Sequence, residues 1–344
     1  MRSLEQRLRE QAEHCRASGS LLMPALLTGA ADDFTAGGIT RDLLGPHAHD
    51  PSGSVPPLRF AGALHRLVLE RKAPELALHY PSVGGTAPVE QVWPAAERAL
   101  REHLAELREL VTRPVQTNEV GRSAVLYGGL LQIPGPIRLL ELGSSAGLNL
   151  RCDAFAHDGF GPQDSPVRLD GAWQGVLPTG SAPQIVSRRG CDPSPIDPLT
   201  TDGRLTLTSY VWADQVERLE RLRGALAVAE RIPTVVERLG AFAFLDRELA
   251  NLPSGVTTVV WHSVVWQYVD PAERRAVDAL LERVGARATE AAPLVRLSLE
   301  PEKVDGAVVF RVRGRRWPGV GSVHLAEALG HGPPVRWTGA RITS

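Results

Sequence analysis

The stretch Ile137–Leu150, with the sequence IRLLELGSSAGLNL, decides the fold of this chain. It begins as a short apolar run bounded by turn residues, which is typical of a parallel strand covered on both faces. Gly143 and Gly147 permit a tight turn and leave room for a ligand, because neither carries a Cβ atom. Glu141 stands near the end of the strand, where a charge is costly unless something binds it. The stretch therefore predicts a strand, a ligand-binding turn and the start of a helix.

Length and composition limit the number of domains, the kinds of partner and the location of the protein. The chain has 344 residues, enough for one large domain or two ordinary ones. Its formal net charge of -1 argues against binding to nucleic acid or to an anionic membrane. No apolar run reaches the roughly 18 residues of a membrane helix, and the charged N-terminal stretch lacks the apolar core of a signal peptide. We expect a cytoplasmic protein that is a monomer or a homodimer.

The three cysteines, Cys15, Cys152 and Cys191, are scattered along the chain. An odd and widely spaced set of this kind forms neither a disulfide framework nor a zinc site. We expect three reduced thiols and no metal centre.

Residues 1–133 have a mostly helical pattern and are expected to form a helical N-terminal cap. The predicted helices include residues 58–70, which contain His65, and residues 87–112. Between these two helices, residues 79–85 are a turn that can line a pocket.

Residues 117–131, just before the decisive strand, are predicted to form a further helix. Its first turn places Asn118, Glu119 and Arg122 on neighbouring faces. These three are either a helix cap with a surface ion pair or polar groups that lie over a ligand site.

The rest of the chain, residues 134–344, alternates strands and helices, which predicts a doubly wound α/β sheet. Residues 157–183 are an insertion with a short hairpin at 167–173. Two late strands are expected to pair as an antiparallel end of the sheet. The predicted strands are 184–190, 234–236, 256–265, 294–299, 308–312 and 322–325, and the predicted helices are 146–156, 213–231 and 271–284.

The acidic-x-Gly-x-x-x-Gly pattern of Glu141, Gly143 and Gly147 resembles the first motif of class I S-adenosylmethionine (SAM) dependent methyltransferases. It fits the dinucleotide pattern G-x-G-x-x-G less well, because Ser145 stands at the second glycine. The resemblance implies a Rossmann-like sheet of parallel strands with a closing antiparallel hairpin. The alternatives are nucleotide binding and a tight strand-to-helix turn without a ligand. The resemblance implies that SAM is bound by Glu141, Gly143, Ser144, Ser145, Gly147, Asn149, Asp192, Ala241 and Phe242.

In that family an acidic residue at the end of the second strand accepts hydrogen bonds from the ribose hydroxyls. Asp192 is the candidate for this role, although its distance along the chain from the glycine turn exceeds the usual interval of about 20 residues. Asp170 is the competitor. Ala241 and Phe242 stand where related enzymes clamp the adenine.

Five segments also resemble an uncharacterised bacterial family, the domain of unknown function numbered 2332. They read TNEVGRSA, LLELGSSAGLNL, GCDPSPIDP, SYVWADQ and VVWHSVVWQYV, and they lie between Thr117 and Val269. The resemblance implies a SAM-binding-like core with a helical N-terminal part. The family name supplies no activity.

These resemblances lead us to expect a methyltransferase whose acceptor is a small molecule with an O or N nucleophile. Such an enzyme mainly aligns the acceptor with the methyl group and excludes water. His262 follows a buried strand and is the candidate base, and Glu119 and Tyr210 are further catalytic candidates. The residues expected to contact the acceptor are Asn118, Arg122, Trp212, Trp266 and Glu300.

Two other functions fit the same sequence. The chain can be a SAM- or nucleotide-binding regulatory protein without transfer chemistry, since a fold does not fix a function. It can also be an enzyme that uses SAM for another reaction. Nucleic acid is not the expected acceptor, because the sequence His262-Ser263-Val264-Val265 stands where enzymes acting on flipped bases have an N/D-P-P-Y/F motif.

Overall fold

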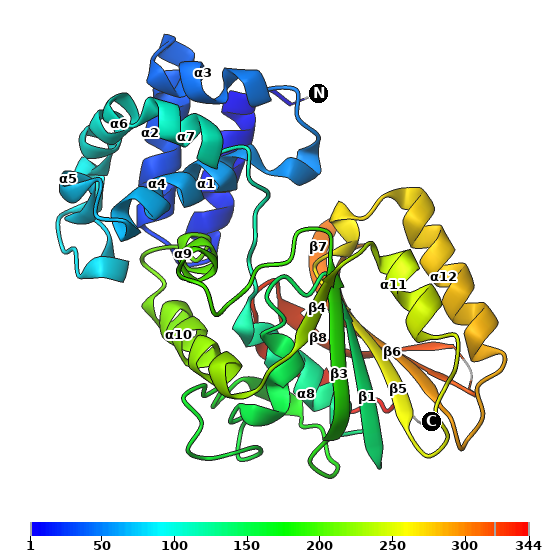
Figure 1. The fold of residues 1–344 in the computed structure, drawn as a ribbon. Coiled ribbons are helices and arrows are strands. Elements are labelled where there is room, and N and C mark those ends of the chain that lie inside the picture. Colours follow the sequence, from blue (N-terminus) through cyan, green and yellow to red (C-terminus); the bar gives the residue numbers. More distant parts are fainter. Residues whose placement is uncertain (1, 320, 343–344) are drawn as a thin grey trace. The chain divides into compact units, whose positions relative to one another are not determined.

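The computed structural model describes residues 2–319 and 321–342. The chain forms two compact units (Figure 1). Unit 1 comprises Met1–Thr117 and Thr200–Glu220, and unit 2 comprises Asn118–Leu199 and Arg221–Ser344. The chain therefore leaves unit 1, builds part of unit 2, and returns once to unit 1. Among the described residues, no helix combines the length and the apolar character needed to span a bilayer.

Unit 1 is helical, as the sequence predicts for its N-terminal part. Leu8, Leu26 and Leu64 are among the fully buried residues of its core. The predicted single helix at 87–112 is wrong, because the chain leaves helical geometry at His103 (φ -118°, ψ 24°) and forms two helices. The α-helices of unit 1 are α1 (Leu4–Ala17), α2 (Leu22–Ala36), α3 (Ile39–Leu44), α4 (Pro56–Leu69), α5 (Pro74–Ala77), α6 (Val92–Glu102), α7 (Leu104–Leu110) and α9 (Thr201–Ser209), and helix α10 (Val216–Arg231) starts in the returning segment.

The returning segment completes unit 1 by capping one of its helices. Leu21, the residue before α2, has no side chain that can accept a hydrogen bond. Asp214 caps the helix instead, because its Oδ2 accepts hydrogen bonds from the N–H groups of Leu21 (2.8 Å) and Leu22 (3.0 Å). A carboxylate at a helix N-terminus satisfies otherwise unpaired N–H groups and interacts favourably with the helix dipole.

Unit 2 is built on a nine-stranded mixed sheet in which parallel pairings predominate. The strand order is β2-β9-β8-β7-β6-β5-β1-β3-β4. Five strands, β4-β3-β1-β5-β6, are parallel, and β6 to β9 form antiparallel pairs. The strands are β1 (Pro136–Leu142), β2 (Trp173–Val176), β3 (Gln184–Asp192), β4 (Val235–Arg238), β5 (Thr257–Ser263), β6 (Leu294–Val304), β7 (Ala307–Trp317), β8 (Ser322–Leu329) and β9 (Gly332–Thr338).

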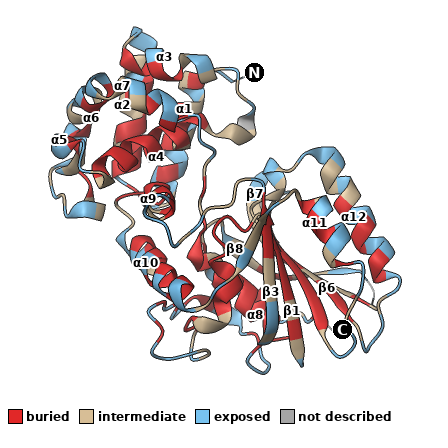
Figure 2. Ribbon diagram, viewed as in Figure 1, coloured by how far each residue is buried: buried red, intermediate tan, exposed pale blue. Residues whose placement is uncertain are grey.

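Helices cover both faces of the parallel strands, which explains why β1 and β5 are buried along most of their length (Figure 2). Helices α11 (Ala241–Glu248) and α12 (Pro271–Gly285) cover the face that carries Leu140 and Val260. Helix α8 (Ser123–Leu130) lies on the opposite face, where Gly129 leaves room for the side chain of Leu297. This two-sided burial accounts for the nearly continuous apolar sequence of the strands.

Several predicted elements of unit 2 are confirmed and others are wrong. The predicted strands at 184–190 and 256–265 correspond to β3 and β5, and the predicted antiparallel pair corresponds to β7 and β8. The predicted helix 146–156 is wrong, because only a short 3-10 helix, Asn149–Ala154, follows the glycine turn. The predicted hairpin at 167–173 is also wrong. Its end belongs to β2, which pairs in parallel with β9 at the edge of the sheet.

Candidate functional site

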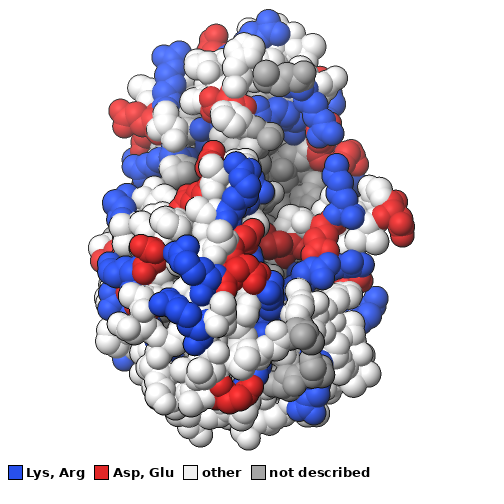
Figure 3. All heavy atoms as spheres, turned by 90° about the vertical axis from the view of Figure 1, so that its right-hand side faces the viewer, with Lys and Arg blue, Asp and Glu red and all other residues white. Residues whose placement is uncertain are grey.

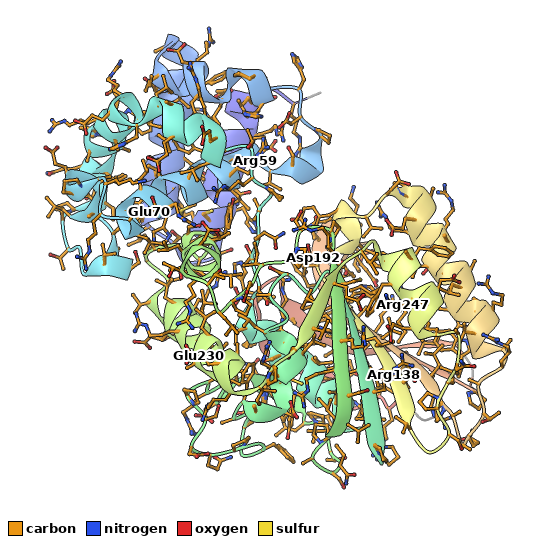
Figure 4. The ribbon with its side chains drawn as sticks, in the orientation of Figure 1. Arg59, Glu70, Arg138, Asp192, Glu230 and Arg247 are labelled. Atoms are coloured by element: carbon orange, nitrogen blue, oxygen red, sulfur yellow. The ribbon has the colours of Figure 1, made fainter. Side chains whose placement is uncertain are left out.

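The candidate site lies at the carboxyl ends of the parallel strands of unit 2. Counted in chain order, the five parallel strands have the spatial order 3-2-1-4-5, so the order reverses between β1 and β5. Ligands of open α/β sheets bind outside the carboxyl ends of the strands at such a switch point. The glycine turn follows β1 directly, and Figure 4 labels Asp192 at the neighbouring end of β3.

The glycine turn has three residues with left-handed backbone geometry, Gly143 (φ 67°), Ser145 (φ 53°) and Gly147 (φ 66°). Ser145 is unusual here, because a residue with a Cβ atom adopts positive φ only at a cost. The Ser144 N–H donates to the carbonyl of Cys191 on β3 (3.0 Å), and the Gly147 N–H donates to the Ser144 carbonyl (2.7 Å). The turn is therefore fixed by its own backbone and by the adjacent strand.

Asp192 holds the strained residue of the turn. Its Oδ2 accepts a hydrogen bond from the Ser145 N–H (2.9 Å), and its Oδ1 accepts one from the Ser194 N–H (2.8 Å). In addition, the N–H of Ile196 donates to the Ser145 carbonyl (3.1 Å). The loop after β3 thus folds over the turn. The competitor Asp170 is exposed in the insertion, where it pairs with Arg168 (2.8 Å).

Neighbouring side chains fill the space beside the two glycines. A Cβ atom added at Gly143 would collide with the side chain of Val265, and one at Gly147 would lie 2.8 Å from Cγ2 of Val236. The lack of a side chain at these positions is therefore required for packing within the protein, on the side to which a Cβ atom would point.

Glu141, the acidic residue of the motif, is 2% exposed between β3 and β5. Its Oε2 has no hydrogen-bond partner among the described residues. The indole of Trp261, its neighbour across the ladder, and the guanidinium groups of Arg122 and Arg151 act to lower its pKa, but burial has the larger effect. Burial raises the pKa of Glu141 to about 8. A buried carboxyl oxygen without a partner is costly, so this position is suited to a cationic or hydrogen-bonding ligand.

Asn118, Glu119 and Arg122 were predicted to lie over the site. In the structure their segment is hydrogen-bonded to the glycine turn, to the 3-10 helix after it, to the end of β5 and to the loop that follows β8. Asn118 Oδ1 accepts a hydrogen bond from the Leu148 N–H (2.8 Å) at the end of the glycine turn. The Glu119 carbonyl accepts one from the side chain of Asn149 (3.1 Å). The chain continues as a 3-10 helix (Val120–Arg122) into α8.

Arg122 connects the same segment to β5 and to the loop between β8 and β9. Its Nε donates to the Gly330 carbonyl between β8 and β9 (2.9 Å), and its Nη1 donates to the Ser263 carbonyl at the end of β5 (3.1 Å). The side chains of Asn118 and Arg122 therefore bind backbone groups of the surrounding loops, and the carbonyl of Glu119 binds the side chain of Asn149.

His262, the predicted base, is 1% exposed near the end of β5 and has both ring nitrogens engaged. Its Nδ1 lies 2.8 Å from Glu300 Oε1, and its Nε2 accepts a hydrogen bond from Arg296 Nε (3.1 Å). An arginine can only donate, so the neutral ring carries its proton on Nδ1. Burial lowers the pKa of His262, despite the hydrogen bond to Glu300. Trp266 stacks on the ring, with 4.1 Å between the ring centroids.

Glu300 fastens the loop after β5 to β6. The strand predicted at 294–299 is longer in the structure, because β6 continues to Val304. Besides His262, Glu300 Oε1 accepts hydrogen bonds from the N–H groups of Val265 (3.2 Å) and Trp266 (3.4 Å). This loop begins with Val264, a β-branched residue at φ 51°. Glu300 therefore holds a strained loop that packs against Gly143 through Val265.

The remaining predicted residues belong to helix α11 or to unit 1. Ala241 and Phe242 begin α11, where Glu273 Oε1 accepts a hydrogen bond from the Phe242 N–H (3.1 Å). Tyr210 and Trp212 belong to unit 1 and are buried there. Tyr210 packs against Gly62 of α4, and Trp212 joins the core of that unit.

Two arginines at this edge were not predicted from the sequence. Arg296 binds His262 and also Asp278 (2.7 Å), and Arg151 donates to the carbonyls of Gly147 (2.7 Å) and Ile232 (2.7 Å). In a chain rich in arginine, nothing in the local sequence distinguishes these two. On the face drawn in Figure 3, basic and acidic side chains interleave, and neither sign forms a continuous patch there.

Comparison with known protein families gives a match over most of the chain. A protein family described as "Uncharacterized protein conserved in bacteria (DUF2332)" matches residues 5–337. No curated protein matches the chain.

Proposed function

The chain belongs to the bacterial family DUF2332, whose description assigns no activity, and we propose that it is a SAM-dependent methyltransferase acting on an O or N nucleophile of a small molecule. Unit 2 would hold the cofactor at the carboxyl ends of β1 and β3. The observation that carries the proposal is the buried carboxyl group of Glu141, whose Oε2 lacks a partner at the switch point of the sheet.

The hydrogen bonds of the glycine turn favour SAM over a nucleotide phosphate. Phosphates bind to free N–H groups at a helix N-terminus. Here the N–H groups of Ser144, Ser145, Gly147 and Leu148 already donate to protein acceptors, and only a short 3-10 helix follows. Little capacity for an anion is left in this part of the turn.

The carboxyl group of Glu141 also fits a cationic ligand. SAM carries a sulfonium and an ammonium group, and a positive charge near Glu141 would favour its ionised form, which burial alone disfavours. A bound cation would also satisfy the oxygen that the described residues leave without a partner. Glu141 therefore fits the proposed cofactor through the charge that it would carry beside a cation and through the oxygen that lacks a partner.

Bound SAM supplies an electrophilic methyl group, so the protein needs only to align the acceptor and exclude water. His262 remains the proposed base for an acceptor that must lose a proton. In the arrangement described, its Nε2 accepts from Arg296, so proton transfer at this atom requires Arg296 to move away. An acceptor that already has a free lone pair needs no such movement.

The same geometry favours a second function, which is SAM binding without transfer. His262 is neutral, buried and hydrogen-bonded at both nitrogens, as expected of a structural histidine. A regulatory protein would keep Glu141 and the glycine turn and would need no base.

Isothermal titration with SAM and with S-adenosylhomocysteine tests the proposal. We expect binding that Glu141→Gln weakens at least tenfold, about 1.4 kcal/mol, because the variant keeps the shape of the side chain and loses its charge. The matched control is Glu290→Gln, at an exposed glutamate of unit 2 beyond the amino end of β6. No heat of binding at millimolar concentration of either ligand would overturn the proposal. Binding without turnover in a screen of small acceptors would favour the second function.

A further inference from the structure

A second group of reactive side chains lies entirely within unit 1, around His65 of α4. The imidazole is 3% exposed. Its Nδ1 lies 3.2 Å from the carbonyl oxygen of Ser209 at the end of α9, and its Nε2 lies 2.8 Å from Oγ of Ser82. The three groups come from three separate segments of the chain, which the fold of unit 1 brings together.

The chemistry of the partners fixes where the protons lie. A carbonyl oxygen only accepts hydrogen bonds, so Nδ1 of His65 carries the proton and donates it to Ser209. The Nε2 atom of the neutral ring is then an acceptor, and the hydroxyl of Ser82 donates to it. Burial lowers the pKa of His65 to about 4, so the ring is neutral near pH 7.

The loop that carries Ser82 is held tightly. Ser82 lies in the 3-10 helix Pro81–Val83, which Gly84 ends at φ 87°. The Gly85 N–H donates to the carbonyl of Tyr80 (3.0 Å), and a Cβ atom at Gly85 would collide with the backbone of Ala77. A rigid loop fixes the direction of the hydroxyl.

Access and orientation differ between the two side chains. His65 is buried and Ser82 is partly exposed, so the serine is the more accessible of the two side chains. A serine hydroxyl that donates to a neutral imidazole, whose other nitrogen is oriented by a third group, is the general arrangement of an activated nucleophile. In this case the third group is a backbone carbonyl.

We propose that Ser82 is a catalytic nucleophile that takes an acyl group from a small ester and passes it to water. Oγ of Ser82 would form a bond to the ester carbonyl carbon while its proton moves to Nε2 of His65. The C–O bond to the alcohol then breaks, and the alcohol leaves with the proton from Nε2. Water attacks the acyl-serine, its proton passes through Nε2 to Oγ of Ser82, and the carboxylic acid is released. No oxidant, metal or cofactor takes part in either half of the reaction.

A fluorophosphonate probe, which phosphonylates activated serines, tests this inference with the full chain. We expect one adduct, located on Ser82 by peptide mass spectrometry, and no adduct at this peptide in Ser82→Ala. The matched control is Ser18→Ala, because Ser18 is also a partly exposed serine of unit 1. Its backbone N–H donates to the carbonyl of His14, but among the described residues its hydroxyl has no hydrogen bond to an imidazole. The control should be labelled as fast as the unmodified protein.

Hydrolysis of p-nitrophenyl butyrate at pH 7 is the second readout. We expect a rate above that of buffer, reduced at least tenfold in Ser82→Ala and changed less than twofold in Ser18→Ala. Circular dichroism of both variants shows whether unit 1 keeps its helices. Absence of an adduct on Ser82, or equal hydrolysis by Ser82→Ala, would overturn the inference. Neither result bears on SAM binding, which the titration measures separately.

Discussion

Asp192 Oδ2 accepts a hydrogen bond from the N–H of Ser145 at 2.9 Å and so joins the end of β3 to the strained residue of the glycine turn. The other oxygen of the same carboxylate accepts from the Ser194 N–H. The residue proposed to bind the ribose therefore already binds two backbone amides of the protein. A ribose contact would have to use the remaining lone pairs of this carboxylate.

Asp192→Asn should destabilise unit 2, because an amide group has one acceptor oxygen and its NH₂ would face the second N–H. We expect a loss of about 1–3 kcal/mol in the free energy of unfolding, typical of a buried hydrogen bond that is broken. Urea denaturation measures this loss. Asp170→Asn, at the exposed competitor, should change stability by less than about 0.5 kcal/mol. Equal effects of the two variants would contradict the role described for Asp192.

Gly143→Ala should be more destabilising than Gly135→Ala, although both glycines have positive φ (67° and 78°). Gly135 has no atom within 4 Å of the Cβ position, so its variant measures backbone strain alone, about 1–2 kcal/mol. At Gly143 the collision with Val265 adds to this strain. The double variant Gly143→Ala/Val265→Ala should recover part of the loss. If the loss of stability in the double variant equals the sum of the losses in Gly143→Ala and Val265→Ala, the contact between the added methyl group and Val265 does not contribute.

Glu141 should make the protein less stable as the pH rises from about 4.5 to 8. Burial raises its pKa to about 8 from 4.5, so in this range the folded state binds a proton that the unfolded state has released. The slope approaches 1.4 kcal/mol per pH unit and stops above pH 8. Denaturation curves at pH 5, 6, 7 and 8 measure it, with Glu141→Gln as the comparison. An unchanged slope in the variant would contradict the buried, protonated Glu141.

Two buried histidines should act in the opposite direction at lower pH. Burial lowers the pKa of His65 and His157 to about 4 from 6.5. Between these values the unfolded state binds more protons, so stability is lost as the pH falls from 6.5 to 4. His157 stacks on Tyr127 in unit 2, with 4.3 Å between the ring centroids. His157→Phe should reduce the number of protons taken up when unit 2 unfolds between pH 4 and 6.5 by about one. The pH dependence of the unfolding free energy of unit 1 should stay unchanged.

Glu300→Gln should loosen the loop after β5, because the amide group keeps one acceptor but loses the charge that three donors share. We expect a destabilisation of about 1–3 kcal/mol and faster hydrogen exchange at the N–H groups of Val265 and Trp266. Glu302→Gln, two residues further along β6, is the matched control. Glu302 pairs with Arg313 and Arg311, and among the described residues it has no hydrogen bond or ion pair with this loop. Equal exchange rates in the two variants would argue against Glu300 as the fastening group.

The parts of the fold that the sequence predicts are those in which one local pattern dominates. The apolar runs of β1 and β5 and the capped helix α12 have strong patterns, and the structure has all three. Strand β9 was missed because Pro333 and Pro334 stand in it, and proline argues against a strand interior. The helix expected after Gly147 was wrong because side-chain contacts, one from the distant Asn118 and one from the nearby Arg151, determine the backbone there. Asn118 takes the Leu148 N–H, and Arg151 takes the Gly147 carbonyl.

For the candidate site, the sequence predicts individual residues but not the atoms that they contact. Glu141 and His262 could be selected from the sequence because each is a polar residue near the end of an apolar strand. Asp192 could be selected because its segment resembles the end of the second strand in SAM enzymes. The atoms to which they bind could not be selected, since Arg296 and Ser145 become neighbours of His262 and Asp192 only through the pairing of strands. His65 and Ser82 are a similar case, because the carbonyl that orients the histidine comes from Ser209.

The return of the chain to unit 1 has a consequence for the protein during its synthesis. Helix α2 leaves the ribosome nearly 200 residues before Asp214, the residue that caps it. Until then the first 117 residues lack α9, the N-cap of α2 and the carbonyl of Ser209. Unit 1 should therefore mature only after β1 and β3 have been made. A nascent chain stopped after residue 117 would expose the apolar surface that α9 later covers and would be a preferred substrate for chaperones.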